Sequence, residues 1–397
     1  MCKTTTPPHT AGQAAIRGFQ PNTAAGAVIP LKSYLQKYVT QFDSHLVPAT
    51  PPTLPSDVDP LAYKRVAFSI LPLRSKDASP YYAGVFDDDT DFSASLLKVA
   101  ALFAAGELLA DAKSAAAGPA NSASYNAGLK AEILANADTR IIHANLPAAS
   151  PVGLYPKTAN ILTGTGPSAD FTSNFAAKQK RMIVESDDPS AGFCIDQLGY
   201  GYISAQLIEE GFFDPATSVG MWLAGDYVQN TYVVRIPCVN DHPDDELTTS
   251  RQMCRLFSMI RLKLVPEHDL ATNKLMQDLL AEPKTNGTTP WIDDSRLHGI
   301  TTSFTIRLDK IGVAGLGTAQ TPNVYSEGLV IEWDDDHQVD AFNARIDPGN
   351  SNPAIRLSGE FAVCWQNLMV DNLSSRFNGV VEVLNSCISD FLDQKAL

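Results

Sequence analysis

The sequence predicts an α+β protein: a five-stranded antiparallel sheet built from both ends of the chain, flanked by terminal helices and carrying an inserted all-α lobe. Three observations lead to this fold class. β-rich runs occur within residues 66–86 and again after residue 300, while the block between them is helical. Amphipathic helical patterns precede the first strands and follow the last. The 397 residues also exceed what one hydrophobic core usually fills, so two lobes are expected.

The N-terminal part is expected to give a flexible arm, a helix and a hairpin. Residues 1–29 are rich in Thr, Pro and Ala and are expected to be the arm. A helix follows Pro30, because apolar residues recur at helical spacing from Leu31 to Leu46. After a Pro-rich connector, the β-rich runs at 66–71 and 81–86 predict two paired strands.

The rest of the chain supplies the helical lobe and the remaining strands. Residues 95–109 are apolar nearly all round, which is typical of a helix buried on every side. Further helical patterns cover 178–185, 190–198, 203–210, 249–262 and 273–280, strand patterns cover 301–308, 324–333 and 360–369, and a last amphipathic helix covers 377–392. We therefore expect an α/β lobe from residues 30–90 and 300–397, and an all-α lobe from residues 91–299.

Composition excludes several classes of partner. The formal net charge of −14 repels phosphate backbones and anionic lipid surfaces, so neither nucleic acid nor a membrane is an expected partner. No run reaches transmembrane length, and residues 1–18 contain no apolar signal segment. A cytoplasmic location is therefore favoured, and an exported mature form stays open as the alternative. The six cysteines form no CxxC pair and are expected to be reduced thiols. The sequence leaves the oligomeric state open.

Two acidic runs are expected to form solvated hairpin turns rather than metal sites. They are Asp87 to Asp89 with Asp91, and Asp334 to Asp336 with His337. We expect no metal and no cofactor.

A candidate nucleophile and base lie together at the start of the buried helix. In Ser95-Leu96-Leu97-Lys98, a hydroxyl and an amine are three residues apart and share one helix face. Burial disfavours the ammonium form of lysine, so Lys98 is suited to take the proton of Ser95.

Two further motifs follow in order: Ser186-Asp187-Asp188 after a helical run, and Lys310-Ile311-Gly312 at the end of a strand. With Ser95-x-x-Lys98, these motifs make the chain resemble the serine β-lactamase and penicillin-binding protein superfamily. That superfamily carries S-x-x-K, S-x-N and K-T-G in this order. The resemblance covers roughly residues 31–397 and implies a β-lactamase/transpeptidase-like fold.

The resemblance also implies roles for individual residues. Ser95 would be the acylated nucleophile, Lys98 its base or proton relay, and Ser186 the proton shuttle to the leaving group. Lys310 would supply positive charge beside Ser186. The backbone N–H groups of Ser95 and Val313, the residue after Gly312, would form the oxyanion hole.

Two positions depart from the motifs of the superfamily. Asp188 replaces an asparagine whose amide donates to a substrate carbonyl, and an ionised aspartate can only accept hydrogen bonds. Ile311 replaces a hydroxyl residue that helps to hold a substrate carboxylate. Asp226 and Asn230 have the spacing of a deacylation pair, although a polar turn also explains them.

The sequence therefore predicts a serine hydrolase that cleaves a small-molecule ester or amide through a Ser95 acyl-enzyme and hydrolyses β-lactams poorly. Two alternatives remain open. One is an acyltransferase of the same fold that forms amides, and the other is a non-catalytic binding protein on this scaffold.

Overall fold

The structure is a computed structural model, and it describes most of the chain after the predicted arm. The described residues are 31–54, 56, 58–74, 82–115, 155–164, 166–223, 236, 238–240, 246–266, 269–283, 292, 304–315, 322–346, 357–370 and 376–393. The predicted arm, residues 1–29, lies outside them.

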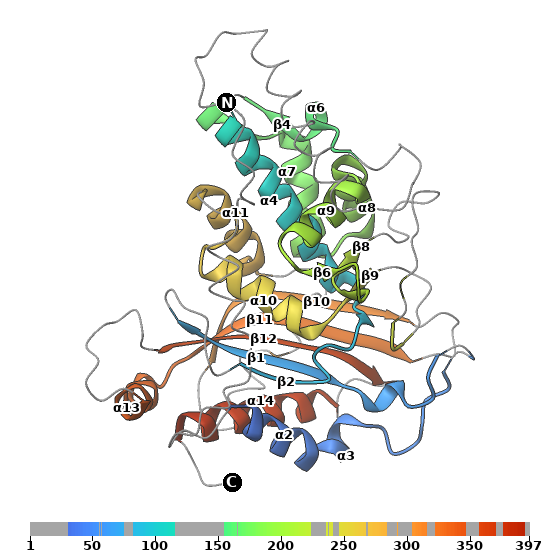
Figure 1. Ribbon diagram of the computed structural model, residues 1–397, viewed down its shortest axis with the longest axis vertical. Helices are drawn as coiled ribbons and strands as arrows, with labels where there is room; N and C mark the ends of the chain where they lie inside the picture. The colour runs from blue at the N-terminus through green and yellow to red at the C-terminus, as the bar shows by residue number, and fades with distance from the viewer. Residues whose placement is uncertain are drawn as a thin grey trace.

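A five-stranded antiparallel sheet lies at the centre of the protein, in the order β10-β11-β12-β1-β2 (Figure 1). Its strands are β1 (Ala67–Arg74), β2 (Ala83–Val85), β10 (Phe304–Gly315), β11 (Asn323–Trp333) and β12 (Leu357–Val370). Two strands come from the first part of the chain and three from the last, so the predicted sheet is confirmed. Strand β10, which carries the third motif, lies at an edge.

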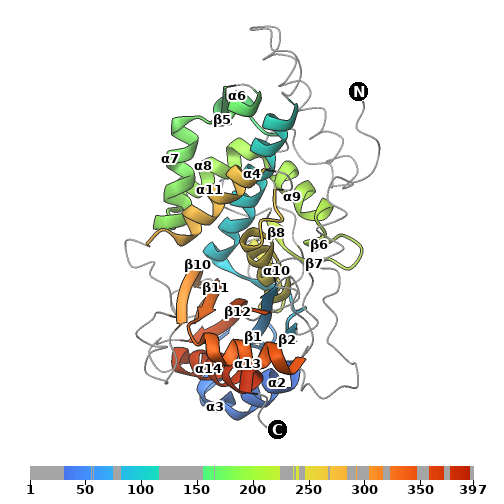
Figure 2. The same ribbon diagram turned by 90° about the vertical axis from the view of Figure 1, so that its left-hand side faces the viewer.

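Helices from both chain ends cover one face of this sheet (Figures 1 and 2). They are α2 (Leu31–Gln41), α3 (Asp43–Leu46) and α14 (Arg376–Asp393). On this face Trp365 of β12 meets Phe377 of α14 edge to ring, with 5.5 Å between ring centroids. Such a pair adds about 0.5–1.5 kcal/mol to the gain from burying apolar area. The apolar stripes predicted at the two chain ends therefore form one core with the sheet.

The inserted helical lobe covers the opposite face. Its helices are α4 (Lys98–Ala115), α6 (Thr158–Ile161), α7 (Ser173–Lys180), η4 (Arg181–Glu185, a π-turn), α8 (Asp188–Leu198), α9 (Tyr200–Glu209), α10 (Ser250–Arg261) and α11 (Leu270–Ala281). Helix α4 runs through the middle of the lobe (Figure 2), and its apolar residues are buried on all sides, as predicted. Helix α10 packs directly on the sheet against β1, β11 and β12.

Short elements connect these parts. They are the 3-10 turns η1 (Ala62–Lys64), η2 (Ala94–Leu97) and η3 (Gly166–Ser168), the pairs β4 (Leu162–Thr163) with β5 (Asp170–Phe171) and β6 (Phe213–Asp214) with β7 (Val219–Gly220), and the small sheet of β3 (Asp91–Phe92), β9 (Glu246–Thr248) and β8 (Trp222–Leu223). Among the described helices, none combines the length and the apolar character that a bilayer crossing requires.

The expectation that both acidic runs form solvated hairpin turns is wrong in part. Asp336 begins a helix, α13 (Asp336–Ile346), instead of closing a hairpin. Asp91 is fully buried and accepts a hydrogen bond from Gln366 Nε2 at 3.2 Å, and burial raises its pKa well above the usual range. Asp87 is bound by Arg251, with Nε 2.7 Å from Oδ2. Two of the acids therefore hold the sheet and the helical lobe together.

Candidate active site

The first motif lies where the chain passes from the sheet into the helical lobe. Ser95 belongs to the 3-10 turn η2, and the backbone N–H of Lys98 donates to the Ser95 carbonyl at the start of α4. The α-helical first turn predicted here is thus a 3-10 turn, in which residues three apart still lie on one side. Ala94, just before Ser95, has φ +49°, a conformation that costs energy in a residue with a side chain.

The second motif forms the turn between η4 and α8. Ser186 has φ +55°, which ends the helical run and reverses the chain. Asp187 then caps α8, because its Oδ2 accepts from the backbone N–H of Ser190 at 3.0 Å. An ion pair of 3.1 Å between Arg181 Nη2 and Asp187 Oδ1 fixes the turn to the preceding helix. These local contacts hold the Ser186 hydroxyl in place.

The third motif lies inside strand β10 instead of at its end, because β10 continues to Gly315. Lys310 is 1% exposed, and its Nζ lies 2.9 Å from Ser186 Oγ and 3.0 Å from the Ile311 carbonyl oxygen. The side chain thus reaches from the edge of the sheet to the second motif.

The Ser186 hydroxyl joins all three motifs. Lys98 Nζ lies 2.6 Å from the Ser186 carbonyl oxygen, 3.3 Å from Ser186 Oγ and 2.5 Å from Asp188 Oδ1. Ser186 Oγ therefore accepts from the amino groups of Lys98 and Lys310. Because the hydroxyl accepts from both lysines, its own hydrogen can be donated to another group.

The protonation of Lys98 depends on two opposing effects. Its side chain is fully buried, and burial lowers the pKa of its amino group below the usual lysine value. The Asp188 carboxylate opposes this effect by its charge and hydrogen bond, and raises the same pKa. A neutral, basic form of Lys98 is therefore easier to reach than for a lysine in water.

A junction of three segments lies directly beneath Ser95. A Cβ on Gly312 would lie 2.2 Å from the Ser93 carbonyl oxygen, 2.6 Å from Ser326 Oγ and 2.7 Å from the Leu96 nitrogen, so only glycine lets β10 approach η2 this closely. Ser326 Oγ donates to the Ser93 carbonyl at 2.8 Å, and the Ser93 N–H donates to the Glu246 carbonyl at 3.0 Å.

Sequence reasoning did not find Ser93 and Ser326. Their contact joins residues 233 positions apart, and the only available signal was a small polar residue within the apolar pattern of β11. The junction, which we call the Ser93 junction (Ser93, Gly312 and Ser326), fixes the strand that carries Val313 against the turn that carries Ser95.

The predicted substrate-binding residues differ in their exposure to solvent. Val313 is 40% exposed on β10 and Asp188 is exposed at the start of α8. Ile311 is 4% exposed and pairs with Glu327, which in turn pairs with Trp365 on the sheet face that α14 covers. Directly opposed residues share a face, and successive residues alternate between faces. Ile311 thus lies on the opposite face of β10 from Lys310, and that it lines the substrate site stays a prediction.

Gly312 acts through close packing in the Ser93 junction. The candidate deacylation residues Asp226 and Asn230 lie outside the described residues. In the described part of the chain, no cluster of His, Cys, Asp and Glu could hold a metal ion.

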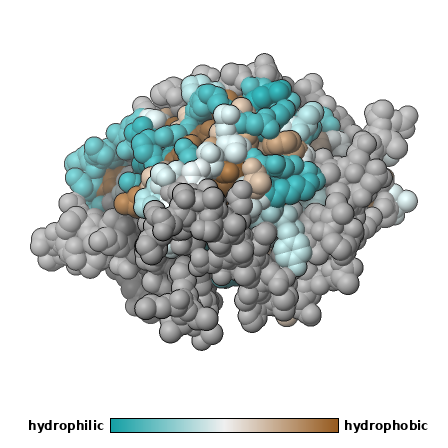
Figure 3. Space-filling model, turned by 90° about the horizontal axis from the view of Figure 1, so that it is seen from above, coloured by the Kyte–Doolittle hydropathy of each residue, from teal (hydrophilic) through white to brown (hydrophobic). Residues whose placement is uncertain are grey.

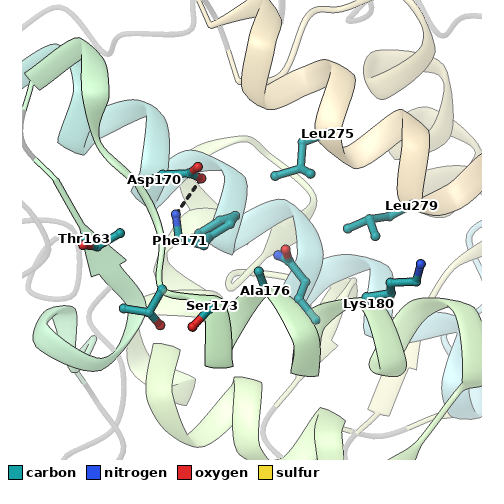
Figure 4. A pocket seen from close by; sticks show the side chains of 10 residues that line it. Thr163, Asp170, Phe171, Ser173, Ala176, Lys180, Leu275 and Leu279 are labelled. Carbon is teal, nitrogen blue, oxygen red and sulfur yellow. Dashed lines mark hydrogen bonds between the residues drawn. The ribbon is translucent and has the colours of Figure 1, made fainter.

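A separate cavity of about 850 Å³ lies between α7 and α11 (Figure 4). Phe171, Leu275 and Leu279 give it apolar walls, and Asp170 and Lys180 lie at its border. Seen from above, the surface of the protein likewise shows apolar patches between hydrophilic borders (Figure 3). None of the residues predicted to act in catalysis lines this cavity.

The chain resembles solved structures of β-lactamases. The β-lactamase from Chitinophaga pinensis is 11% identical, with 90% of this chain and 98% of that one covered and a TM-score of 0.47. Those from Burkholderia phymatum and Xanthomonas campestris are 14% and 12% identical, with coverage of 91% and 92% of this chain and 99% of theirs, and TM-scores of 0.45 and 0.44. No protein-family model and no curated protein sequence matches the chain.

The order of elements within this chain agrees with the fold predicted from its sequence. A helix, two strands, a helical insertion, three strands and a last helix follow one another, and the three motifs meet where the sheet and the helical lobe join. The protein thus has the α+β fold predicted from the sequence: a five-stranded antiparallel sheet, flanked by terminal helices, that carries an inserted all-α lobe.

Proposed function

We propose that the protein is a serine hydrolase that cleaves an ester or amide through an acyl-enzyme on Ser95. The observation that carries the proposal is the Ser186 hydroxyl, which lies within hydrogen-bond distance of both Lys98 Nζ and Lys310 Nζ. Lys98 and Lys310 are both buried and converge on this hydroxyl, and Lys98 lies one turn from Ser95. Together these groups form a path for moving a proton.

Acylation begins with the neutral form of Lys98. This amine takes the proton of the Ser95 hydroxyl while Ser95 Oγ attacks the substrate carbonyl carbon. The carbonyl oxygen becomes an oxyanion, which the backbone N–H groups of Ser95 and Val313 stabilise. The Ser93 junction supports this arrangement because it holds η2 and β10 at a fixed separation.

Collapse of the tetrahedral intermediate requires a proton on the leaving group. Ser186 donates its hydroxyl proton as the bond to the leaving group breaks, and Lys98 returns the proton taken from Ser95 to Ser186 through their 3.3 Å contact. The charge of Lys310 keeps Ser186 polarised. Water then hydrolyses the Ser95 ester and regenerates the enzyme, so that one water is consumed in each cycle.

The site favours uncharged substrates over penicillins and cephalosporins, which carry a carboxylate. Lys310 is almost fully buried, while the exposed Asp188 carboxylate repels an anion and cannot donate to an acyl carbonyl. The hydrogen bond that Asp188 cannot donate to the acyl carbonyl is such a loss, and a lost hydrogen bond to a charged or buried polar group costs about 1.5–3 kcal/mol. We therefore expect feeble β-lactam turnover.

Hydrolysis of a short-chain nitrophenyl ester by the wild type and by Ser95→Ala tests the proposal. We expect turnover by the wild type, none above background by Ser95→Ala, and a lower kcat/KM for a chromogenic cephalosporin. Product analysis with an added amine separates hydrolysis from transfer. Equal turnover by the wild type and Ser95→Ala would contradict the proposal.

A further inference from the structure

The positive and negative charges around Ser186 differ in their burial. The two cationic side chains, Lys98 and Lys310, are 0% and 1% exposed. The Asp188 side chain, which pairs with Lys98, is 73% exposed. Positive charge therefore faces the interior and negative charge faces the solvent from which a substrate arrives.

Arg181, the neighbouring cation on this turn, does not add free positive charge to the exposed side of the site. Arg181 is held by two acids, with its Nε 3.1 Å from Glu185 Oε2 and its Nη2 3.1 Å from Asp187 Oδ1. On strand β10, the exposed residues beyond Lys310 are Val313 and Gly315, and neither has a charge. Within the described residues of the turn and strand, Asp188 is thus the exposed charge that stands next to the site lysines.

The chemistry of acylation increases the effect of Asp188. While Lys98 is an ammonium, it offsets the negative charge of Asp188 at 2.5 Å. The proposed base is the neutral amine, and in that form Lys98 no longer offsets the carboxylate. The state that attacks substrate is therefore the state in which the Asp188 charge is least compensated.

We propose that Asp188 selects substrates whose acyl group carries a positive charge, such as an ester or amide of an ammonium-bearing acid. The proposal rests on the proposed hydrolase function and names its substrate class. Asp188 Oδ1 accepts from Lys98, which anchors the carboxylate, and the exposed remainder of the group meets the incoming acyl chain. An acceptor with negative charge complements a cation and opposes a carboxylate.

Two isosteric esters test this selection. One is the nitrophenyl ester of trimethylammoniobutyrate, and the other is its uncharged analogue in which carbon replaces the quaternary nitrogen. The readout is the ratio of their kcat/KM values on one enzyme, so any effect of a substitution on Lys98 itself cancels. We expect the wild type to prefer the cationic ester about fivefold, the scale of one partly exposed charge pair.

Matched variants locate the origin of the preference. Asp188→Asn keeps the size of the side chain and removes its charge, and should bring the ratio close to one. Glu185→Gln makes the same change of charge three residues away and should leave the ratio as in the wild type. Added salt should lower the wild-type ratio because it screens exposed charges, and this readout requires no variant.

The outcomes separate this proposal from the proposed function. Ser95-dependent hydrolysis of the uncharged ester, with a ratio of one or less in the wild type, would overturn the selection by Asp188 and leave the hydrolase intact. An equal loss of the ratio in Glu185→Gln would assign the preference to general surface charge and also overturn it. Absence of Ser95-dependent hydrolysis for both esters would overturn the function itself.

Discussion

The Ser93 junction and the turn at Ser186 hold their residues by different means. In the junction, Gly312 and Ser326 fix the Ser93 carbonyl through close approach and one neutral hydrogen bond of 2.8 Å. At the turn, Ser186 is held between two lysines, one of which pairs with an exposed carboxylate. The junction therefore depends on shape, and the turn depends on charge.

This difference predicts two kinds of pH dependence for the effect of a substitution on the rate. Packing at the junction does not titrate, so a defect there should lower the rate equally at every pH. The contacts at the turn change with protonation, so a defect there should also change the pH profile or the selectivity. Substitutions in the two regions test the distinction.

The largest effect on rate is expected from Lys98→Ala at the turn. Loss of the general base should lower the acylation rate by ~10²–10⁴. Stopped-flow measurement of nitrophenol release gives this rate. Lys113→Ala is the control. Lys113 lies on the same helix α4, but its amine pairs with Asp269, so its removal should leave the acylation rate at the wild-type value. An acylation rate in Lys98→Ala close to that of the wild type would remove Lys98 from the mechanism.

A smaller loss is expected from Gly312→Ala in the junction. The added methyl group would overlap the Ser93 carbonyl, so β10 and η2 must separate, at a cost in overpacking of about 1–3 kcal/mol. Both thermal stability and kcat should fall, with the loss of kcat equal across pH. Gly315→Ala on the same strand is the control, because its new methyl group would meet Asn323 Oδ1 only at 3.6 Å. Equal behaviour of the two variants would contradict the role of the junction.

Ser326→Ala removes only the hydroxyl and should have a milder effect. The lost hydrogen bond is worth about 0.5–1.5 kcal/mol. If the transition state is destabilised by the same amount, kcat should fall roughly two- to thirteenfold. The KM value should stay unchanged because the hydroxyl does not reach the substrate. Ser258→Ala, which deletes a buried hydroxyl bonded to the Arg255 carbonyl at 2.7 Å, should lose stability but keep kcat. A change of KM alone in Ser326→Ala would argue against a positioning role.

The smallest effect is expected in the pH profile. The acylation rate should rise as Lys98 loses its proton, with an apparent pKa below that of a lysine in water because of burial. Asp188 raises this pKa, so Asp188→Asn should move the rising limb to lower pH. The profile of kcat/KM for an uncharged ester measures the shift. A shift to higher pH would mean that the charge of Asp188 does not act on Lys98.

The sequence was sufficient to predict elements with strong periodicity and motifs with fixed spacing. The buried helix after Ser95, the split sheet and the order of Ser95, Ser186 and Lys310 all depend on local patterns. The outward orientation of Asp188 and the burial of Ile311 depend on which strand or helix packs beside them. Asp336 begins a helix because residues beyond the acidic run continue a helical pattern, which the run itself does not reveal.

Covalent labelling of Ser95 tests the central claim most directly. The wild type and Ser95→Ala are treated with a serine-reactive phosphonate, and their intact masses are measured. We predict one adduct per wild-type chain, located on Ser95 by peptide mapping, and no adduct on Ser95→Ala. Equal labelling of both proteins, or an adduct on a different serine, would contradict it.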